Sequence, residues 1–182
     1  MKKKLPFDRC YWVVPDKLLA GYYPGDPNQG GTIAKLTALL DAGIRAFVDL
    51  TEEDELNRWG IGLVPYENDL MQAAEAKGIA GLSYRRMTIP DLGVRTKDAM
   101  REILDTIDGE MENGHPVYVH CLGGIGRTGT VVGCWLARHG IASGEAALDR
   151  IAELRRNDPS ADVPSPETRQ QRNFARTWKA GE

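Results

Sequence analysis

The chain has 182 residues, of which 42% are hydrophobic and 27% are charged. This composition is typical of one globular domain with a substantial core, and it excludes an intrinsically disordered chain. The formal net charge of −3 disfavours sequence-independent binding of nucleic acids, which usually requires a basic protein. We therefore expect a single domain over residues 1–182, with residues 1–9 as a flexible tail, and no nucleic-acid partner.

The chain begins with a methionine and three lysines. Pro6, Asp8 and Arg9 then interrupt any apolar segment, and no apolar run is long enough to span a bilayer. We therefore expect neither a signal peptide nor a membrane partner. The sequence leaves the oligomeric state open.

Three cysteines, Cys10, Cys121 and Cys134, are widely spaced and include no Cys-x-x-Cys pair. Their spacing predicts free thiols rather than a disulfide framework, and it provides no metal site. Free thiols indicate a reducing compartment, so the expected location is the cytoplasm. Core packing is predicted for Cys134, and a role for Cys10 as a resolving thiol for oxidised Cys121 stays open.

Short apolar runs predict β-strands, and the longer stretches between them have helical spacing. In chain order, the predicted strands are Tyr11–Val14, Leu18–Gly21, Ile44–Leu50, Leu82–Ile89 and Pro116–His120. The predicted helices cover residues 33–40, 67–77, 100–111, 128–139, 144–156 and 166–179. Ser165 is predicted to cap the last helix, with Pro166 at its first position. This alternation indicates an α/β fold with a central, mainly parallel sheet flanked by helices.

The most informative stretch is an apolar strand that leads into Cys121, a glycine-rich turn and Arg127 at the start of a helix. Three glycines within five residues allow the backbone N–H groups to point towards a common centre. Such a turn at a helix N-terminus binds a tetrahedral dianion, and it favours a thiolate at Cys121. Arg127 adds a planar donor that matches two phosphate oxygens.

Two other interpretations of this stretch are weaker. A buried cysteine is usually an inert small hydrophobe, but this one is followed by an arginine and a hydroxyl at a fixed spacing. A nucleotide-binding loop of the Walker type requires a lysine where Arg127 stands.

The residues from His120 to Gly129 read His-Cys-x-x-Gly-x-Gly-Arg-Thr-Gly, which is the signature of the protein tyrosine phosphatase superfamily. The chain resembles the compact dual-specificity-like branch, including bacterial and archaeal members and the cyclin-dependent kinase inhibitor-associated phosphatases. Residues 89–94 are similar to the mobile general-acid loop, and residues 165–174 to a C-terminal element of several members. The resemblance implies the cysteine phosphatase (phosphotyrosine protein phosphatase II-like) fold.

The resemblance also implies the roles of the site residues. Cys121 would be the nucleophile that forms a cysteinyl-phosphate, Asp91 the general acid, and Thr128 the hydroxyl that stabilises the thiolate as it leaves. The phosphate would be bound by Leu122, Gly123, Gly124, Ile125, Gly126 and Arg127. His120 would support Cys121 from beneath the loop, and Gln171, with Gln170 as its rival, would position the hydrolytic water. The mechanism implies no cofactor.

The resulting hypothesis is a phosphoprotein phosphatase, with phosphotyrosine preferred and dual specificity possible. Strict tyrosine specificity is disfavoured because the chain lacks the Asn-Arg-Tyr loop of the long tyrosine-specific domains. Phosphoinositides are disfavoured because no lysine stands between Leu122 and Gly126. The alternatives are a phosphatase for a small molecule, a phosphoinositide or an RNA 5′ end, and a catalytically silent phosphate-binding module.

Overall fold

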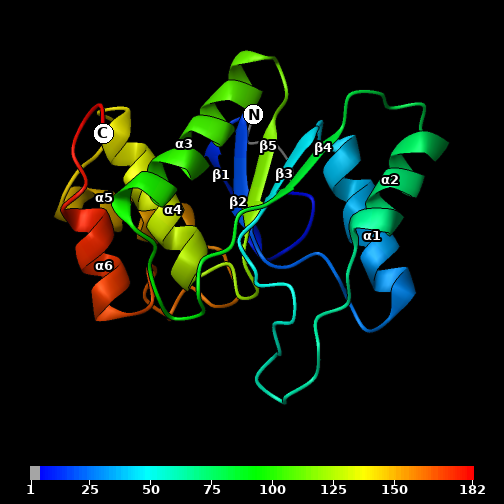
Figure 1. Ribbon diagram of the computed structural model, residues 1–182, viewed down its shortest axis with the longest axis horizontal. Coiled ribbons are helices and arrows are strands. Elements are labelled where there is room, and N and C mark those ends of the chain that lie inside the picture. The colour runs from blue at the N-terminus through cyan, green and yellow to red at the C-terminus, as the bar shows by residue number, and fades with distance from the viewer. Residues whose placement is uncertain (1–4) are drawn as a thin grey trace.

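The structure is a computed structural model that describes residues 5–182 (Figure 1). The strands are β1 (Cys10–Val14), β2 (Leu18–Gly21), β3 (Ala46–Asp49), β4 (Ser83–Arg86) and β5 (Val117–His120). They form one sheet in the order β1-β2-β5-β3-β4. Only β1 runs antiparallel to its neighbour, so the predicted mainly parallel sheet is confirmed.

Helices cover both faces of this sheet. They are α1 (Gln29–Asp41), α2 (Glu67–Ala76), α3 (Lys97–Glu112), α4 (Gly126–Arg138), α5 (Glu145–Leu154) and α6 (Arg169–Arg176). Helices α1 and α2 lie on one side of the sheet, and α3 to α6 lie on the other (Figure 1). The predicted α/β class is therefore confirmed.

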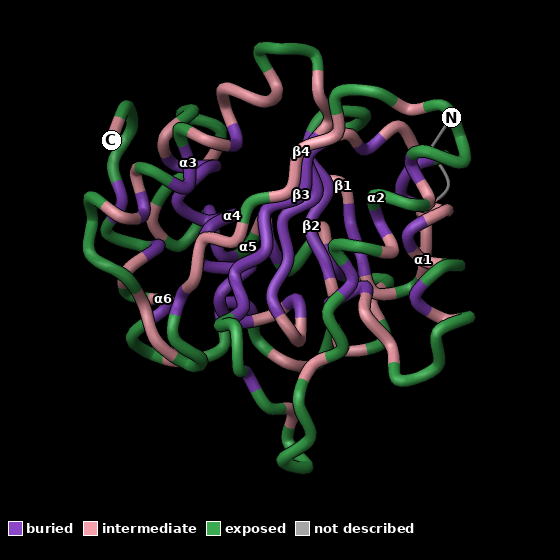
Figure 2. The backbone as a smooth tube through the Cα atoms, turned by 45° about the vertical axis from the view of Figure 1, so that its right-hand side comes forward, coloured by how far each residue is buried: buried purple, intermediate pink, exposed green. Residues whose placement is uncertain are grey.

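The core consists of two apolar layers, one on each face of the sheet. Successive side chains of a strand point to opposite faces, so Val117 and Val119 pack beneath α3 and α4 while Tyr118 packs towards α1. Strands β2, β3 and β5 are buried along their whole length (Figure 2). This burial explains why these three strands read as apolar runs rather than as alternating patterns.

Five of the six predicted helix starts differ from the structure, by one to four residues, and two of these differences bear on the site. Helix α4 begins at Gly126, so Arg127 belongs to its first turn. Helix α6 begins at Arg169 and is capped by Thr168, not by Ser165. The Ser165 hydroxyl instead donates to the carbonyl of Ile125, 2.7 Å away, because this segment packs against the start of α4.

The predicted N-terminal tail differs in part. Residues 1–4 lie outside the described residues, but residues 5–9 contact the domain. Phe7 packs edge-on against Tyr118, and Arg9 donates a hydrogen bond to the carbonyl of Gly123. The segment from residue 5 onwards is therefore part of the folded unit.

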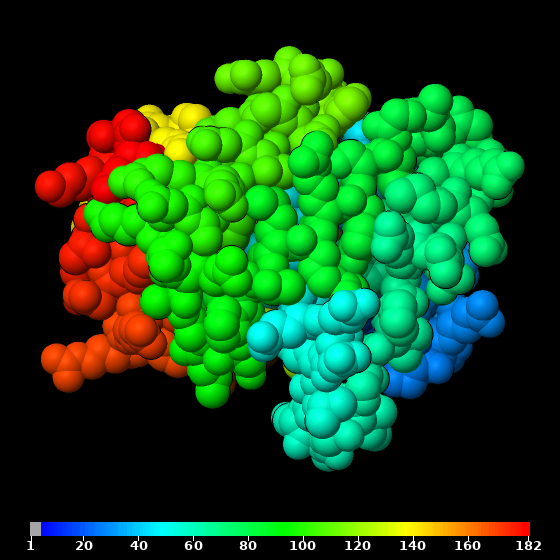
Figure 3. All heavy atoms as spheres, in the orientation of Figure 1, coloured from blue at the N-terminus to red at the C-terminus, as the bar shows by residue number. Residues whose placement is uncertain are grey.

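A long loop over residues 52–65, the 52–65 loop, projects from the body of the domain (Figure 3). It connects β3 to α2. Within the loop, an isolated antiparallel β-bridge joins Leu56 to Gly62. Strands β2, β5, β3 and β4 are parallel and in register. The last residues of β2, β5 and β3, which are Gly21, His120 and Asp49, therefore lie at the same edge of the sheet. The 52–65 loop begins at this edge, where α/β proteins usually place their sites.

Between residues 5 and 182, no helix combines the length and the apolar character that crossing a membrane requires.

Candidate active site

Cys121 follows the last residue of β5 and lies beside the first turn of α4. Its side chain is only 2% exposed. The Thr128 hydroxyl donates to the Cys121 sulfur over 3.1 Å. The sulfur therefore has both the N-terminus of α4 and a hydroxyl donor close by.

The turn that follows Cys121 is constrained to glycine at two positions. Gly124 has a φ of 69°, and a Cβ there would lie 2.6 Å from the carbonyl carbon of Gly21 at the end of β2. A Cβ on Gly126 would lie 2.9 Å from the side-chain oxygen of Gln171. The loop predicted to bind phosphate is thus wedged between the sheet and the start of α6.

Arg127 is buried, and its guanidinium makes a two-pronged ion pair with Glu55 in the 52–65 loop. Both Nη1 and Nη2 donate to the Glu55 carboxylate over 2.6 Å. Burial opposes the charge, but the hydrogen bonds and the charge of Glu55 outweigh it and raise the pKa of Arg127 above its ordinary value. The cation therefore stays charged and held in one orientation.

Sequence reasoning missed Glu55. An acidic run, Glu52 to Glu55, follows β3 directly, so a carboxylate at this edge of the sheet was readable from the sequence. The pattern does not say which of the four acids turns inward. In the structure only Glu55 is buried, whereas Glu52, Glu53 and Asp54 are exposed.

Asp91, in the loop after β4, contacts the same guanidinium as Glu55. Its carboxylate lies 3.2 Å from Nη2 of Arg127, although its side chain is 60% exposed. The next residue, Leu92, has a φ of 57°, a left-handed conformation that costs a non-glycine residue about 1–2 kcal/mol. Asp91 is therefore brought to the phosphate loop, as predicted, at the expense of local backbone strain.

The start of α6 holds the Asp91 loop in this position. The Thr168 hydroxyl donates to the carbonyl of Leu92, and the Gln171 amide donates to the carbonyl of Gly93. Gln171 also accepts from the Thr168 backbone, so both ends of its amide are bound. Gln171 is fully buried and Gln170 is exposed, but the predicted role in positioning water stays a prediction.

His120 lies beneath the loop, as expected. Its Nδ1 is 3.3 Å from the carbonyl of Cys121, and its Nε2 is 2.5 Å from the hydroxyl of Tyr66. Burial lowers the pKa of His120, although the nearby Asp49 carboxylate acts in the opposite direction. A neutral ring that donates from Nδ1 to the carbonyl and accepts from Tyr66 satisfies both contacts.

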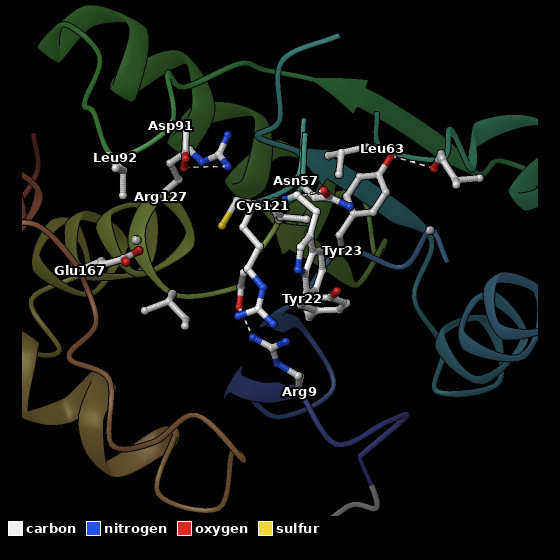
Figure 4. Close-up of a pocket in the computed structure, with 18 of the residues that line it drawn as sticks. Arg9, Tyr22, Tyr23, Asn57, Leu63, Asp91, Leu92, Cys121, Arg127 and Glu167 are labelled. Carbon is white, nitrogen blue, oxygen red and sulfur yellow. Dashed lines mark hydrogen bonds and ion pairs between the residues drawn. The ribbon is translucent and has the colours of Figure 1, made fainter. Parts of the chain in front are cut away.

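The predicted nucleophile, cation and acid line one pocket of about 440 Å³ (Figure 4). Cys121, Arg127 and Asp91 line it together with Leu122, Gly123, Ile125 and Gly126. Residues from the 52–65 loop form another part of the wall. Within residues 5–182, no group of three or more histidine, cysteine or acidic side chains is arranged to hold a metal ion.

Comparison with known proteins decides the family. The family described as "Polymorphic toxin system, DSP-PTPase phosphatase" matches residues 25–141, which is more than half of the chain. The chain belongs to the dual-specificity-type protein tyrosine phosphatases. The resemblance found in the sequence is therefore confirmed.

Individual relatives in this family are distant. Mouse dual specificity protein phosphatase CDC14B is 24% identical over 128 residues, which cover 70% of this chain and 24% of CDC14B. Phosphatidylglycerophosphate phosphatase PTPMT1 of Arabidopsis thaliana is 27% identical over 117 residues, covering 52% of this chain and 34% of PTPMT1. The chain thus spans only a quarter to a third of the length of these relatives.

The fold is shared over nearly the whole chain. The crystal structure of PTPMT1 in complex with PI(5)P aligns with a TM-score of 0.67 at 21% identity, over 94% of each chain. An alignment of this extent confirms the predicted cysteine phosphatase fold. At this level of identity it carries no information about the substrate.

The ion pair of Arg127 yields a first prediction. Glu55→Gln keeps the shape and a hydrogen-bond acceptor but removes the charge that orients the guanidinium. We expect the catalytic efficiency on an aryl phosphate to fall by about 10²-fold, the loss that a misplaced catalytic group produces. Glu53→Gln, the same change at an exposed position of the same loop, is the control. Equal activity of the two folded variants would show that Glu55 has no part in orienting Arg127.

A second prediction concerns the three free thiols. Burial raises the pKa of Cys10 to about 12 and also raises that of Cys134, so both remain neutral at pH 7. Because only a thiolate reacts readily, iodoacetamide at pH 7 should modify Cys121 first, with activity falling in step. Inorganic phosphate should protect it.

Peptide mass mapping during the reaction measures the order of modification. When the pH is raised towards 12, iodoacetamide should also modify Cys10, because its thiolate then forms. Modification of Cys10 or Cys134 before Cys121 at pH 7 would contradict the assignment of the reactive thiolate.

Proposed function

We propose that the protein is a phosphoprotein phosphatase that prefers phosphotyrosine and also accepts phosphoserine or phosphothreonine. The observation that carries this proposal is the meeting of Cys121, Arg127 and Asp91 at one pocket, with Thr128 bonded to the cysteine sulfur. A thiol chemistry of this kind requires a reducing compartment, so we place the protein in the cytoplasm.

In the first step, the Cys121 thiolate attacks phosphorus, the S–P bond forms and the bond to the leaving oxygen breaks. Arg127 and the backbone N–H groups of residues 122–127 bind the equatorial oxygens and stabilise their charge. Asp91 donates its proton to the leaving oxygen. The incoming phosphate takes the place of Asp91 as a partner of the Arg127 Nη2 group.

In the second step, water attacks phosphorus and the S–P bond breaks, which releases phosphate. Asp91 accepts the proton of the water, and the Thr128 hydroxyl stabilises the departing thiolate through the 3.1 Å hydrogen bond seen in the structure. Gln171 positions the Asp91 loop through Gly93 and is the candidate for orienting the water.

The depth of the pocket supports the preference for phosphotyrosine. Cys121 is only 2% exposed, so a phosphate must enter on a long side chain to reach the sulfur. Aromatic side chains of Tyr22, Tyr23 and Trp59 line the pocket and suit contact with a phenyl ring. The 52–65 loop supplies the wall that the missing Asn-Arg-Tyr loop provides in longer tyrosine-specific domains.

A small phosphate monoester, such as a lipid headgroup, is the alternative that the relatives raise. PTPMT1 of Arabidopsis is named a phosphatidylglycerophosphate phosphatase, and a structure of PTPMT1 holds PI(5)P. The loop between Cys121 and Arg127 contains no lysine that would pair with further phosphates of such a headgroup. Peptides phosphorylated on tyrosine, serine or threonine, compared with phosphoinositides and phosphatidylglycerophosphate by kcat/KM, distinguish these substrate classes.

A third prediction tests the nucleophile. Cys121→Ser should retain the fold and the binding of inorganic phosphate but lose turnover of para-nitrophenyl phosphate, because a serine hydroxyl does not ionise in this site. Cys10→Ser is the matched control that keeps its activity. Residual turnover above about a hundredth of the wild-type rate would exclude Cys121 as the nucleophile, since removal of a covalent catalyst costs far more. No turnover by the wild type would leave a silent phosphate-binding module.

A fourth prediction tests the general acid. Asp91→Asn should lower kcat on phenyl phosphate by about 10²–10⁴-fold, and by much less on an aryl phosphate whose leaving group needs no proton. The basic limb of the pH–rate profile should disappear in this variant, because it reports loss of the acid's proton. Asp98→Asn, at an 88% exposed carboxylate on α3, is the control. Equal losses on both substrates would place the acid elsewhere.

A further inference from the structure

Opposite charges flank the mouth of the pocket. Arg9, which precedes β1, and Glu167, which precedes α6, both line the pocket that contains Cys121. Figure 4 shows Arg9 and Glu167 on opposite sides of the Cys121 sulfur. Neither residue has a role in the chemistry proposed above.

Arg9 is held in place without neutralisation. Its guanidinium lies 4.2 Å over the ring of Tyr22, and its Nη2 donates to the carbonyl of Gly123 over 3.1 Å. Among residues 5–182, no carboxylate forms an ion pair with Arg9, and its Nη1 group donates to no side chain or carbonyl. A cation that is fixed by an aromatic ring and a carbonyl keeps donors available for an anion.

Glu167 has the complementary arrangement. Its carboxylate lies against the other end of the phosphate loop, 3.3 Å from the position that a Cβ on Gly126 would occupy. Only its backbone carbonyl is engaged within the described part of the chain, by Arg172, and its side chain makes no ion pair there. The residue is exposed, so no packing requirement explains a carboxylate beside a phosphate-binding loop.

We propose that Arg9 and Glu167 determine specificity by reading charges on the two sides of the phosphorylated residue, an acidic side chain at Arg9 and a basic one at Glu167. The proposal rests on the phosphoprotein phosphatase function. It favours a peptide over a lipid because a peptide carries charges of both signs around its phosphate, whereas a phosphomonoester headgroup adds only negative charge. A basic group at Glu167 would also offset the repulsion between that carboxylate and the phosphate dianion.

The test uses two phosphotyrosine peptides of identical composition. One carries glutamate before and lysine after the phosphotyrosine, the other carries them in the reverse order, and a third carries alanine at both positions. We expect one order to exceed the other by about tenfold in kcat/KM, the scale of one charge-assisted contact, and the difference to shrink as salt is raised. The charge-swapped variant, Arg9→Glu with Glu167→Lys, should invert the order.

Single variants provide the decisive readout where the swapped protein melts too early to assay. Arg9→Gln keeps a donor for Gly123 and Glu167→Gln keeps the side-chain shape, and each should reduce the preference between the two orders. Arg150→Gln, which removes an exposed cation of α5 that pairs with Glu153, is the matched control with an unchanged preference. A merely structural role of Arg9 would lower the rates on all three peptides equally.

The outcomes separate this proposal from the function on which it rests. If all three peptides are hydrolysed at equal rates, or if the single variants keep the wild-type preference, the charge reading is wrong and the phosphoprotein function stands. If para-nitrophenyl phosphate is hydrolysed but no phosphopeptide is, both proposals are overturned. In that case, hydrolysis of phosphatidylglycerophosphate vesicles would identify the lipid alternative.

Discussion

The buried ion pair between Arg127 and Glu55 is the interaction on which the site depends. Placing a guanidinium in the protein interior costs several kcal/mol of hydration free energy, and only a well-matched acceptor offsets that cost. Glu55 is such an acceptor, with two hydrogen bonds of 2.6 Å. Because Glu55 belongs to the 52–65 loop, the pair also ties this projecting loop to the phosphate loop and thereby forms one wall of the pocket. The orientation of the Arg127 guanidinium and the shape of the pocket therefore have a common cause.

A second constraint is the close approach of three separate segments to the phosphate loop. The end of β2 contacts Gly124, Gln171 of α6 contacts Gly126, and Ser165 donates to Ile125. Each contact excludes a larger side chain or fixes a carbonyl, so the loop has little freedom to change its shape. A rigid cradle is what phosphoryl transfer requires, since most of its catalysis comes from positioning and preorganised charge. The C-terminal segment thus supports the site although Ser165 lies forty residues from Ile125 in sequence.

Local patterns predicted most of the fold and the centre of the site. The five strands follow from short apolar runs, and the stripe from Met100 to Ile107 follows from helical spacing, and a single sequence records both well. The signature from His120 to Gly129 locates the proposed nucleophile because its residues are adjacent in the chain. Glu55 could not be singled out, since its burial depends on a loop conformation that its acidic neighbours do not share. The start of α6 was misplaced for a similar reason, because Ser165 satisfies its hydroxyl with a carbonyl on another element rather than with its own helix.

The contact between Asp91 and Arg127 links substrate binding to the chemistry. The Asp91 carboxylate lies 3.2 Å from Nη2 of a cation that is also paired with Glu55. In the proposed mechanism, an incoming phosphate dianion competes for the same guanidinium and replaces the cation beside Asp91 with a negative charge. The exchange frees the Asp91 carboxylate from the guanidinium, while Thr168 and Gln171 keep the Asp91 loop at the pocket.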